Sequence, residues 1–305
     1  METFRRLIEA IEAEGAAALI TLAETAGSAP REAGARMVVR PSGGFFGTIG
    51  GGELEFEALE AARAALAAGR GPARRRSVAL GPELGQCCGG RVVWRVETFD
   101  RRDLAELAPL AAAERAGPFA ALAHLAEDGR VARRRDDGAA AEGVWREAFG
   151  EPTTPVYLFG AGHVGRALAL ALAPLPFTVT WIDPRPDEFP RLAPTNVTMV
   201  AAADPQAELK AAPDGALVLA ITHSHPLDLA VVAEALRQDR FAYVGMIGSA
   251  TKRARFVSQL RAAGIAEERV AKLVCPIGVA GIVGKEPAVI AVAVAAQLLM
   301  ARGAP

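Results

Sequence analysis

The chain has 305 residues, and its 34 lysines and arginines nearly balance its 35 aspartates and glutamates. The resulting net charge of -1 provides no global field that would draw the protein to nucleic acid or to an anionic membrane. The length suits two domains of ordinary size, so we expect a two-domain protein with small-molecule or protein partners.

Cysteine content and apolar runs indicate the cellular compartment. The chain has three cysteines, too few for a disulfide framework at this size, which favours a reducing compartment. Glu9, Glu12 and Glu14 interrupt the N-terminal stretch, so it lacks the apolar core of a signal peptide. The longest apolar run, Ala288–Ala296, is far shorter than the ~20 residues that span a bilayer. We therefore expect a cytoplasmic protein with no membrane segment.

The N-terminal part has the pattern of an α+β domain. Apolar residues first recur at helical spacing, and short runs typical of strands then alternate with glycine-rich turns. We expect a helix at Phe4–Glu14, strands at Ala16–Ala23, Ala35–Arg40 and Phe45–Gly47, and a second helix that ends at Gly69.

A glycine run lies at the start of that second helix. Gly50, Gly51, Gly52 and Glu53 lead directly into it, which leaves backbone N–H groups exposed at a helix N-terminus. Such an end attracts anions. Glycines that merely let the chain reverse explain the run equally well, so both interpretations stay open.

Two adjacent cysteines, Cys87 and Cys88, lie in a glycine-rich loop at 81–90, between expected strands at 74–80 and 91–99. A structural cysteine usually occupies an apolar periodic position, whereas this polar loop would expose a thiolate to a ligand. Adjacent cysteines also lack the C-x-x-C spacing of zinc sites. We therefore expect a functional role, in which the soft thiolate meets molybdenum, copper or a sulfur-transfer partner.

The segment 103–152 carries little functional information. It predicts a helix at Leu104–Arg115 and a hairpin around Asp128-Gly129. We interpret the arginine triplets at 74–76 and 133–135 as solvated strand edges or loop faces, because arginine commonly protects exposed edges. The prolines near residue 150 predict a boundary between an N-terminal domain, 1–150, and a C-terminal domain, 151–305.

The C-terminal domain opens with a dinucleotide-binding pattern. An apolar strand precedes Gly160, Gly162 and Gly165 in a G-x-G-x-x-G motif, and a helix and a second strand ending at Asp183 follow. The glycines permit a tight turn, close approach of a pyrophosphate and close packing of helix on strand, and the acid suits a ribose hydroxyl. The pattern predicts a Rossmann-like doubly wound α/β domain and, taken alone, an NAD-dependent enzyme.

Further polar residues follow the expected strands of this domain. His223 and His225 lie in a Thr-His-Ser-His-Pro turn, where open α/β sheets bind ligands. No third metal ligand has suitable spacing, so contact with a ligand or ordering of the loop is favoured. His163 lies within the glycine loop and is a ligand contact or a surface residue. Ser249 and Lys252 begin another helix whose N-terminus suits an anion.

The final helix, which begins after Glu286, is apolar nearly all round. Such a helix must be buried, either in the domain core or in a subunit interface. The second possibility predicts a homodimer, and the first explains the composition equally well.

A set of motifs occurs in a fixed order: Gly27-Ser-Ala-Pro-Arg31, Gly47-Thr-Ile-Gly-Gly-Gly-Glu53, Gln86-Cys-Cys-Gly-Gly90, the Rossmann glycines, Thr222-His-Ser-His-Pro226 and Gly245-Met-Ile-Gly-Ser249. In order and spacing they resemble the XdhC/CoxI family, accessory proteins of xanthine dehydrogenase and related molybdenum hydroxylases. The paired cysteines and Gly284-Lys-Glu-Pro287 resemble the xanthine dehydrogenase branch. The CoxI branch typically has a single cysteine, which Cys88 would match.

The resemblance implies a chaperone rather than a catalyst. Such a protein binds molybdenum cofactor in its molybdopterin form, protects it while its terminal oxo ligand is exchanged for sulfur, and inserts it into apo-xanthine dehydrogenase. The implied partners are the molybdenum-binding subunit of the dehydrogenase and a cysteine desulfurase as sulfur donor.

On this hypothesis Cys88, with Cys87 beside it, contacts molybdenum. The pterin phosphate is expected at one of three helix N-termini, Gly50–Glu53, Gly160–Gly165 or Ser249–Lys252. An NAD(P)-dependent oxidoreductase with His223 or His225 as its acid is the main alternative. A docking protein with a vestigial Rossmann scaffold is the third.

Overall fold

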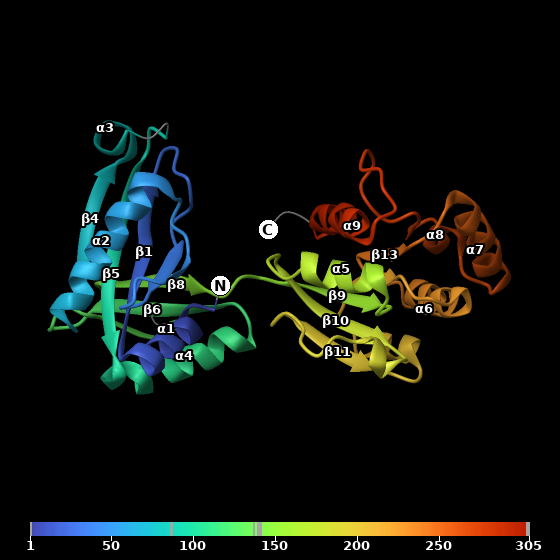
Figure 1. Cartoon of the computed structure of the whole chain (residues 1–305), viewed down its shortest axis with the longest axis horizontal. Helices are drawn as coiled ribbons and strands as arrows, with labels where there is room; N and C mark the ends of the chain where they lie inside the picture. Colours follow the sequence, from blue (N-terminus) through green and yellow to red (C-terminus); the bar gives the residue numbers. More distant parts are fainter. Residues whose placement is uncertain (1, 86–87, 137, 139–141, 303–305) are drawn as a thin grey trace. The chain divides into compact units, whose positions relative to one another are not determined.

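The computed structural model describes residues 2–85, 88–136, 138 and 142–302. The chain divides into two compact units, residues 1–152 and residues 153–305 (Figure 1). Each unit has its own hydrophobic cores. The division falls two residues beyond the boundary that the sequence predicts.

The first unit is built on a five-stranded antiparallel sheet with strand order β3-β2-β1-β5-β4. Its strands are β1 (Ala16–Ala26), β2 (Arg36–Val39), β3 (Phe45–Gly47), β4 (Arg74–Ala79) and β5 (Arg91–Asp100). Its helices are α1 (Thr3–Glu14), α2 (Gly52–Ala68), α3 (Leu80–Leu84) and α4 (Leu104–Ala116), with a 3-10 turn at Arg101–Asp103. The expected α+β domain is therefore confirmed.

Both faces of this sheet are buried, because successive residues of a strand point to opposite sides. On the central strand β1, Ile20 and Leu22 lie in the core that α2 covers. Ala17 and Leu19 lie in a second core, beneath α1 and α4. A fully buried leucine or isoleucine contributes about 1.5–3 kcal/mol, so this two-sided burial fixes the register of β1.

A three-stranded antiparallel sheet with order β7-β6-β8 completes the first unit. Its strands are β6 (Phe119–Leu125), β7 (Val131–Arg135) and β8 (Val144–Phe149). The side chain of Arg133 on β7 is 3% exposed and ion-paired with Glu97 and Glu147, so its assignment to a solvated edge is wrong. The triplet at 74–76 is exposed on the edge strand β4, as predicted.

The second unit contains a six-stranded parallel sheet with order β11-β10-β9-β12-β13-β14. Its strands are β9 (Thr154–Phe159), β10 (Phe177–Asp183), β11 (Val197–Ala201), β12 (Leu217–Ala220), β13 (Tyr243–Met246) and β14 (Leu273–Val274). In chain order this is 3-2-1-4-5-6, the order of a Rossmann-like doubly wound domain. The predicted C-terminal fold class is thus confirmed.

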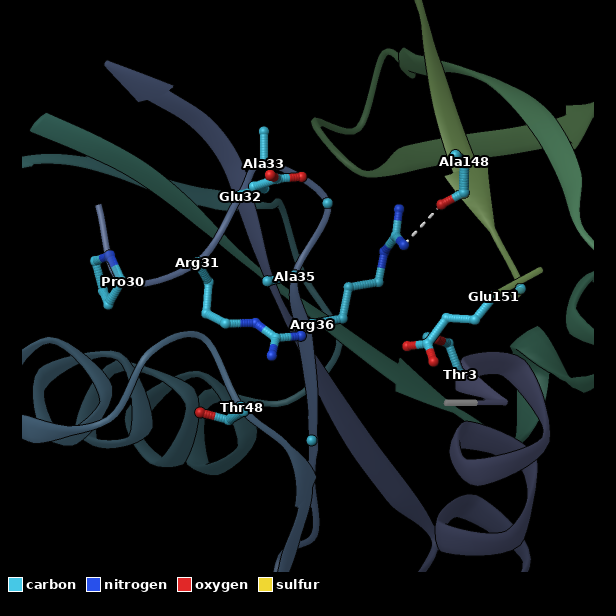
Figure 2. Close-up of a pocket in the computed structure, with 13 residues that line it drawn as sticks. Thr3, Pro30, Arg31, Glu32, Ala33, Ala35, Arg36, Thr48, Ala148 and Glu151 are labelled. Atoms are coloured by element: carbon cyan, nitrogen blue, oxygen red, sulfur yellow. Dashed lines mark hydrogen bonds between the residues drawn. The ribbon is translucent and has the colours of Figure 1, made fainter. Parts of the chain in front are cut away.

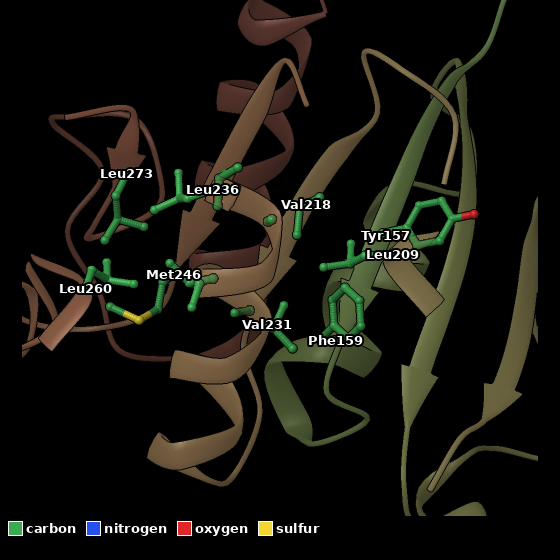
Figure 3. Close-up of a cluster of buried hydrophobic side chains, with 14 of the residues drawn as sticks. Tyr157, Phe159, Leu209, Val218, Val231, Leu236, Met246, Leu260 and Leu273 are labelled. Atoms are coloured by element: carbon green, nitrogen blue, oxygen red, sulfur yellow. The ribbon is translucent and has the colours of Figure 1, made fainter. Parts of the chain in front are cut away.

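Helices cover both faces of that sheet. They are α5 (His163–Ala171), α6 (His225–Gln238), α7 (Ala250–Ala262), α8 (Glu267–Val270) and α9 (Pro287–Ala301), with 3-10 helices at Pro186–Glu188 and Pro205–Lys210. One core contains residues of α5 and α9. The other contains residues of α6, α7 and α8, such as Val231 and Leu260, and residues of the sheet, such as Met246 of β13 (Figure 3).

Two elements differ from expectation. Residues 80–84, predicted as strand end and loop, form the short helix α3, which ends at Gly85. Helix α9 is not buried all round within this chain: Val294 and Leu298 are buried, whereas Val292 and Met300 are 57% and 77% exposed. Burial in the core therefore accounts for one face of α9. Within the part of the chain that is described, no helix combines the length and apolar character needed to cross a membrane.

Candidate functional site

Three motifs of the first unit meet although they lie far apart in sequence. The Gly90 N–H donates to the Ser28 carbonyl at 3.0 Å, and a Cβ on Gly90 would lie 2.3 Å from that oxygen. A Cβ on Gly50 would lie 2.4 Å from Cγ of Pro30. The glycines at these positions therefore allow the loops at 47–53 and 88–90 to pack against the loop at 27–31.

Cys88 belongs to this group of loops. It is half-buried and packs against the core that α2 covers. Cys87, the second predicted metal contact, lies outside the described residues. The structure therefore gives Cys88 a defined position in the first unit, beside the loops that contain the other motif residues.

The glycine run at the start of α2 has an internal anion. The Glu55 carboxylate accepts hydrogen bonds from the Thr48 hydroxyl at 2.6 Å and from the Ile49 and Gly51 N–H groups at 3.1 Å each. Gly52 and Glu53 are exposed at the same helix end. One of the N–H groups expected to bind a ligand phosphate, that of Gly51, thus already donates to Glu55 in the first turn of α2, as does the N–H group of Ile49.

An open pocket of about 740 Å³ is lined in part by residues of the Gly27–Arg31 and Gly47–Glu53 motifs. Figure 2 shows this pocket. Pro30, Arg31 and Thr48 line one side, and Arg36, Ala148 and Glu151 contribute to the rest. The volume is within the range of small-molecule sites. Sequence reasoning missed Arg31 and Arg36 as site residues, although Arg31 ends the Gly-Ser-Ala-Pro-Arg motif.

Arg36 has an unusual environment for a cation. It is 9% exposed, its Nη1 donates to the Ala148 carbonyl at 2.8 Å, and its guanidinium lies 3.8 Å from the centre of the Phe149 ring. Burial lowers the pKa of Arg36 to about 10, against the attraction of Glu147, and repulsion from Arg133 and Arg95 adds to the lowering. The side chain is still a cation at neutral pH.

In the second unit the glycine loop has the expected Rossmann geometry. Gly160 has φ +119°, and a Cβ there would lie 2.4 Å from the Ile221 carbonyl oxygen. A Cβ on Gly165 would lie 2.0 Å from the Gly160 carbonyl oxygen. A Cβ on Gly162, by contrast, would meet nothing within 4 Å. Gly160 and Gly165 are therefore required by packing, and Gly162 faces open space at the start of α5.

Asp183 is bonded to its own neighbours. Its Oδ2 accepts from the Ala161 N–H at 2.8 Å and from Arg185 Nη2 at 3.0 Å, and its Oδ1 accepts from Arg185 N and Nε at 2.9 Å each. Burial alone would raise the pKa of Asp183, but these hydrogen bonds hold it below its ordinary value. A carboxylate has about four acceptor positions, so a ribose hydroxyl would have to displace one of these donors.

The remaining predicted residues lie at helix starts: His163 begins α5, and the others lie at the starts of α6 and α7. His163, His223 and His225 are exposed, and His225 Nδ1 lies 3.2 Å from Arg255 Nη2. Ser249 accepts from the Lys252 N–H at 3.2 Å and caps α7. Among the described residues, no three His, Cys, Asp or Glu side chains are grouped so that they could hold a metal ion.

Lys252 is committed to a buried carboxylate. Its Nζ lies 2.7 Å from Oδ2 of Asp228 and 3.0 Å from the Ile247 carbonyl oxygen. Asp228 Oδ1 also accepts from the Thr222 N–H and hydroxyl, at 2.9 and 2.8 Å. This cluster joins the Thr222–Pro226 and Gly248–Lys252 loops, so Lys252 has a structural role.

The fold and these motifs define a two-unit α/β protein with a Rossmann-like second unit. The chain belongs to the XdhC and CoxI family: the model of the XdhC Rossmann domain matches residues 156–298, and that of the XdhC and CoxI family matches residues 10–76. Cys88 lies between the two matched segments. Their order is that of the two units in the structure.

Two individual proteins are similar to this chain over most of its length. An uncharacterised protein of Escherichia coli K12, YqeB, is 28% identical over 289 residues, which are 93% of this chain but 43% of YqeB. A solved structure from Bacillus halodurans, described as a xanthine dehydrogenase, has 18% identity and a TM-score of 0.76 over 99% of this chain and 96% of that one. The second similarity concerns the fold alone. This chain spans less than half the length of YqeB.

Proposed function

We propose that this protein takes part in the maturation of a xanthine dehydrogenase or related molybdenum hydroxylase. In this role it binds molybdenum cofactor as cargo, protects it during sulfuration and delivers it to the apoenzyme. Family membership supports the role. The observation that carries the proposal is the meeting of three motifs: residues of Gly27–Arg31 and Gly47–Glu53 line one pocket, and Gly90 of the Cys88–Gly90 motif packs against Ser28 of the first.

The chemistry of these residues suits such a cargo. A thiolate is a soft ligand of the kind that binds molybdenum or passes sulfur, and Cys88 is half-buried rather than sealed in the core. Arginines are the usual partners of phosphate, and Arg31 and Arg36 line the pocket. We assign Cys88 the contact with molybdenum and the pocket the organic part of the cofactor.

The NAD(P)-dependent oxidoreductase remains the main alternative, and the open space at Gly162 is the observation that favours it. The four hydrogen bonds on Asp183 count against it, because the ribose contact that the motif predicts is occupied.

The ligand content of the purified protein separates these functions. We would isolate the full chain from molybdate-fed cells, release its ligand, and assay oxidised-pterin fluorescence, molybdenum and nicotinamide. Pterin with molybdenum supports the cofactor carrier. Nicotinamide alone supports the oxidoreductase, and an empty protein supports a docking role.

Cys88→Ala tests the metal contact. We expect this variant to carry less molybdenum per pterin and to activate the apo-dehydrogenase poorly, because the pterin site keeps its own contacts while the thiolate is lost. Cys275→Ala, which removes a buried thiol of the second unit, is the matched control. Full cofactor loading and full activation by Cys88→Ala would show that the assignment of Cys88 is wrong.

A further inference from the structure

The pocket of the first unit contains a buried cation that is not ion-paired with any carboxylate of the described residues. Arg36 is 9% exposed, and its Nε makes no hydrogen bond within the described residues. Its only hydrogen bond to a described residue is the one from Nη1 to the Ala148 carbonyl, although a guanidinium has five N–H donors. A buried charge that lacks an ion pair and most of its hydrogen bonds is costly, so a group of this kind requires an explanation.

The glutamates near Arg36 are ion-paired with other arginines. Glu97 and Glu147 form a closed network with two other arginines, Arg95 and Arg133. In that network Arg133 lies 2.6 Å from Glu97 and 2.8 Å from Glu147, and both arginines are less than 9% exposed. Two carboxylates are therefore shared by two guanidinium groups, and Arg36 is left as a third cation.

Glu114 is also committed. It accepts the N–H groups of Thr3 and Phe4 at 2.8 and 2.9 Å, at the start of α1. Burial raises the pKa of Glu114 against these hydrogen bonds, which weakens it as a counterion. No ion pair joins Arg36 to any carboxylate in the part of the chain that the structure describes.

From this geometry we infer that Arg31 and Arg36 form a subsite for a phosphate monoester, and that this subsite holds the phosphate of the pterin cargo. The assignment of the cargo rests on the proposed function, whereas the phosphate chemistry rests on the two arginines. Both side chains line the same pocket (Figure 2). Arg31 is exposed and makes no hydrogen bond or ion pair within the described residues, so its guanidinium is available.

A carboxylate of the pocket fits a mixed ligand. Glu32, which is exposed, also lines it. A pterin carries amino and ring N–H donors that suit a carboxylate, and its phosphate suits arginine. A ligand with both groups matches the composition of the pocket better than a bare anion does.

A titration of the full chain with inorganic phosphate, followed by ³¹P NMR, tests the subsite. We expect saturable binding that weakens about tenfold in Arg36→Gln and in Arg31→Gln, since one charge-assisted contact corresponds to about that factor. Arg74→Gln, which removes an exposed arginine of β4 outside the pocket, should bind phosphate as the wild type does. The exposed position of Arg31 makes its variant informative even if Arg36→Gln fails to fold.

Unchanged phosphate affinity in Arg31→Gln and in a folded Arg36→Gln, or no saturable binding by the wild type, would overturn the subsite. The proposed function fails on a different result, namely wild-type protein from molybdate-fed cells without pterin or molybdenum. A protein that carries pterin but whose arginine variants bind phosphate normally would refute the subsite and leave the carrier role intact.

Discussion

The Asp183 carboxylate of the second unit accepts four hydrogen bonds from its own neighbours, whereas the Arg36 guanidinium of the first unit donates one to a described residue. The glycine loop at Asp183 matches a ligand-binding motif, and no motif predicts Arg36. Asp183 nevertheless has more of its hydrogen-bonding capacity used by other residues of the chain than Arg36 has. A motif therefore predicts backbone geometry, and the hydrogen-bond partners decide which groups are available to a ligand.

The same contrast holds elsewhere. Glu55 occupies the N–H groups of the glycine run before α2, and Asp228 occupies Lys252. Three helix ends are expected to hold a phosphate. At Gly50–Glu53 and at Gly160–Gly165, backbone N–H groups already donate to carboxylates of this chain, Glu55 and Asp183. At Ser249–Lys252, the lysine is paired with Asp228. The cations without ion pairs in the described part of the pocket are Arg31 and Arg36.

The largest effect is expected from Asp228→Ala. Asp228 is fully buried, and its loss leaves the Lys252 ammonium, 12% exposed, without a counterion. Breaking a buried pair in this way costs about 3–5 kcal/mol, measurable as a fall in the free energy of unfolding in urea. Asp214→Ala, at an 85% exposed carboxylate paired with Arg240, should cost under about 1 kcal/mol. Equal losses in the two variants would refute the structural role of Asp228.

The pH dependence of stability tests the closed network of the first unit. Burial alone would raise the pKa of Glu147, but Arg133 and Arg95 hold it at about 2, below its ordinary 4.5. A depressed carboxylate pKa stabilises the fold above the unfolded value, and this stabilisation is lost as pH falls towards the folded value. We expect a loss on the order of 3 kcal/mol between pH 4.5 and pH 2.

Glu147→Gln should remove that acid-dependent loss, and the check is urea unfolding across the same pH range. Glu127→Gln, at an exposed glutamate of the β6–β7 hairpin, is the control and should retain it. If Glu147→Gln kept the wild-type slope, the network would not be the source of the acid sensitivity.

The smallest effect is expected from Gly162→Asp. Gly162 is the N-cap of α5 with φ −71°, and a Cβ there meets nothing within 4 Å. An aspartate should therefore be accommodated and should stabilise the unit by a few tenths of a kcal/mol as a cap. Thermal unfolding measures this, and a marked destabilisation would show that the loop is more crowded than the structure indicates.

Much of the fold was predictable from local patterns. The alternation of strands and helices after Gly160 fixed the Rossmann-like unit, and the turns before Gly50 placed the first three strands. Residues 80–84 were missed, because a five-residue helix with an internal glycine and proline has the composition of a turn. The exposed residues of α9 were missed because composition alone does not show which face packs on α5.

The site was less predictable, because availability depends on partners distant in sequence. The sequence pattern around Arg133 predicts a surface residue, because its partner Glu97 lies 36 positions away. Asp183 was expected at a ribose, and its bond to Ala161 appears only once the loop and β10 are brought together. No sequence pattern predicts that Arg36 is buried, because its burial results from β8 packing near the start of β2.

Pterin content after purification from molybdate-fed cells tests the central claim most directly, when Arg36→Gln and Gly162→Asp are compared with the wild type. The first variant removes a cation from the pocket, and the second adds a carboxylate to the open face of the Rossmann loop. We predict that Arg36→Gln loses most of its pterin and that Gly162→Asp keeps the wild-type amount. Loss of pterin from Gly162→Asp with full retention by Arg36→Gln would contradict this account and place the phosphate at the glycine loop.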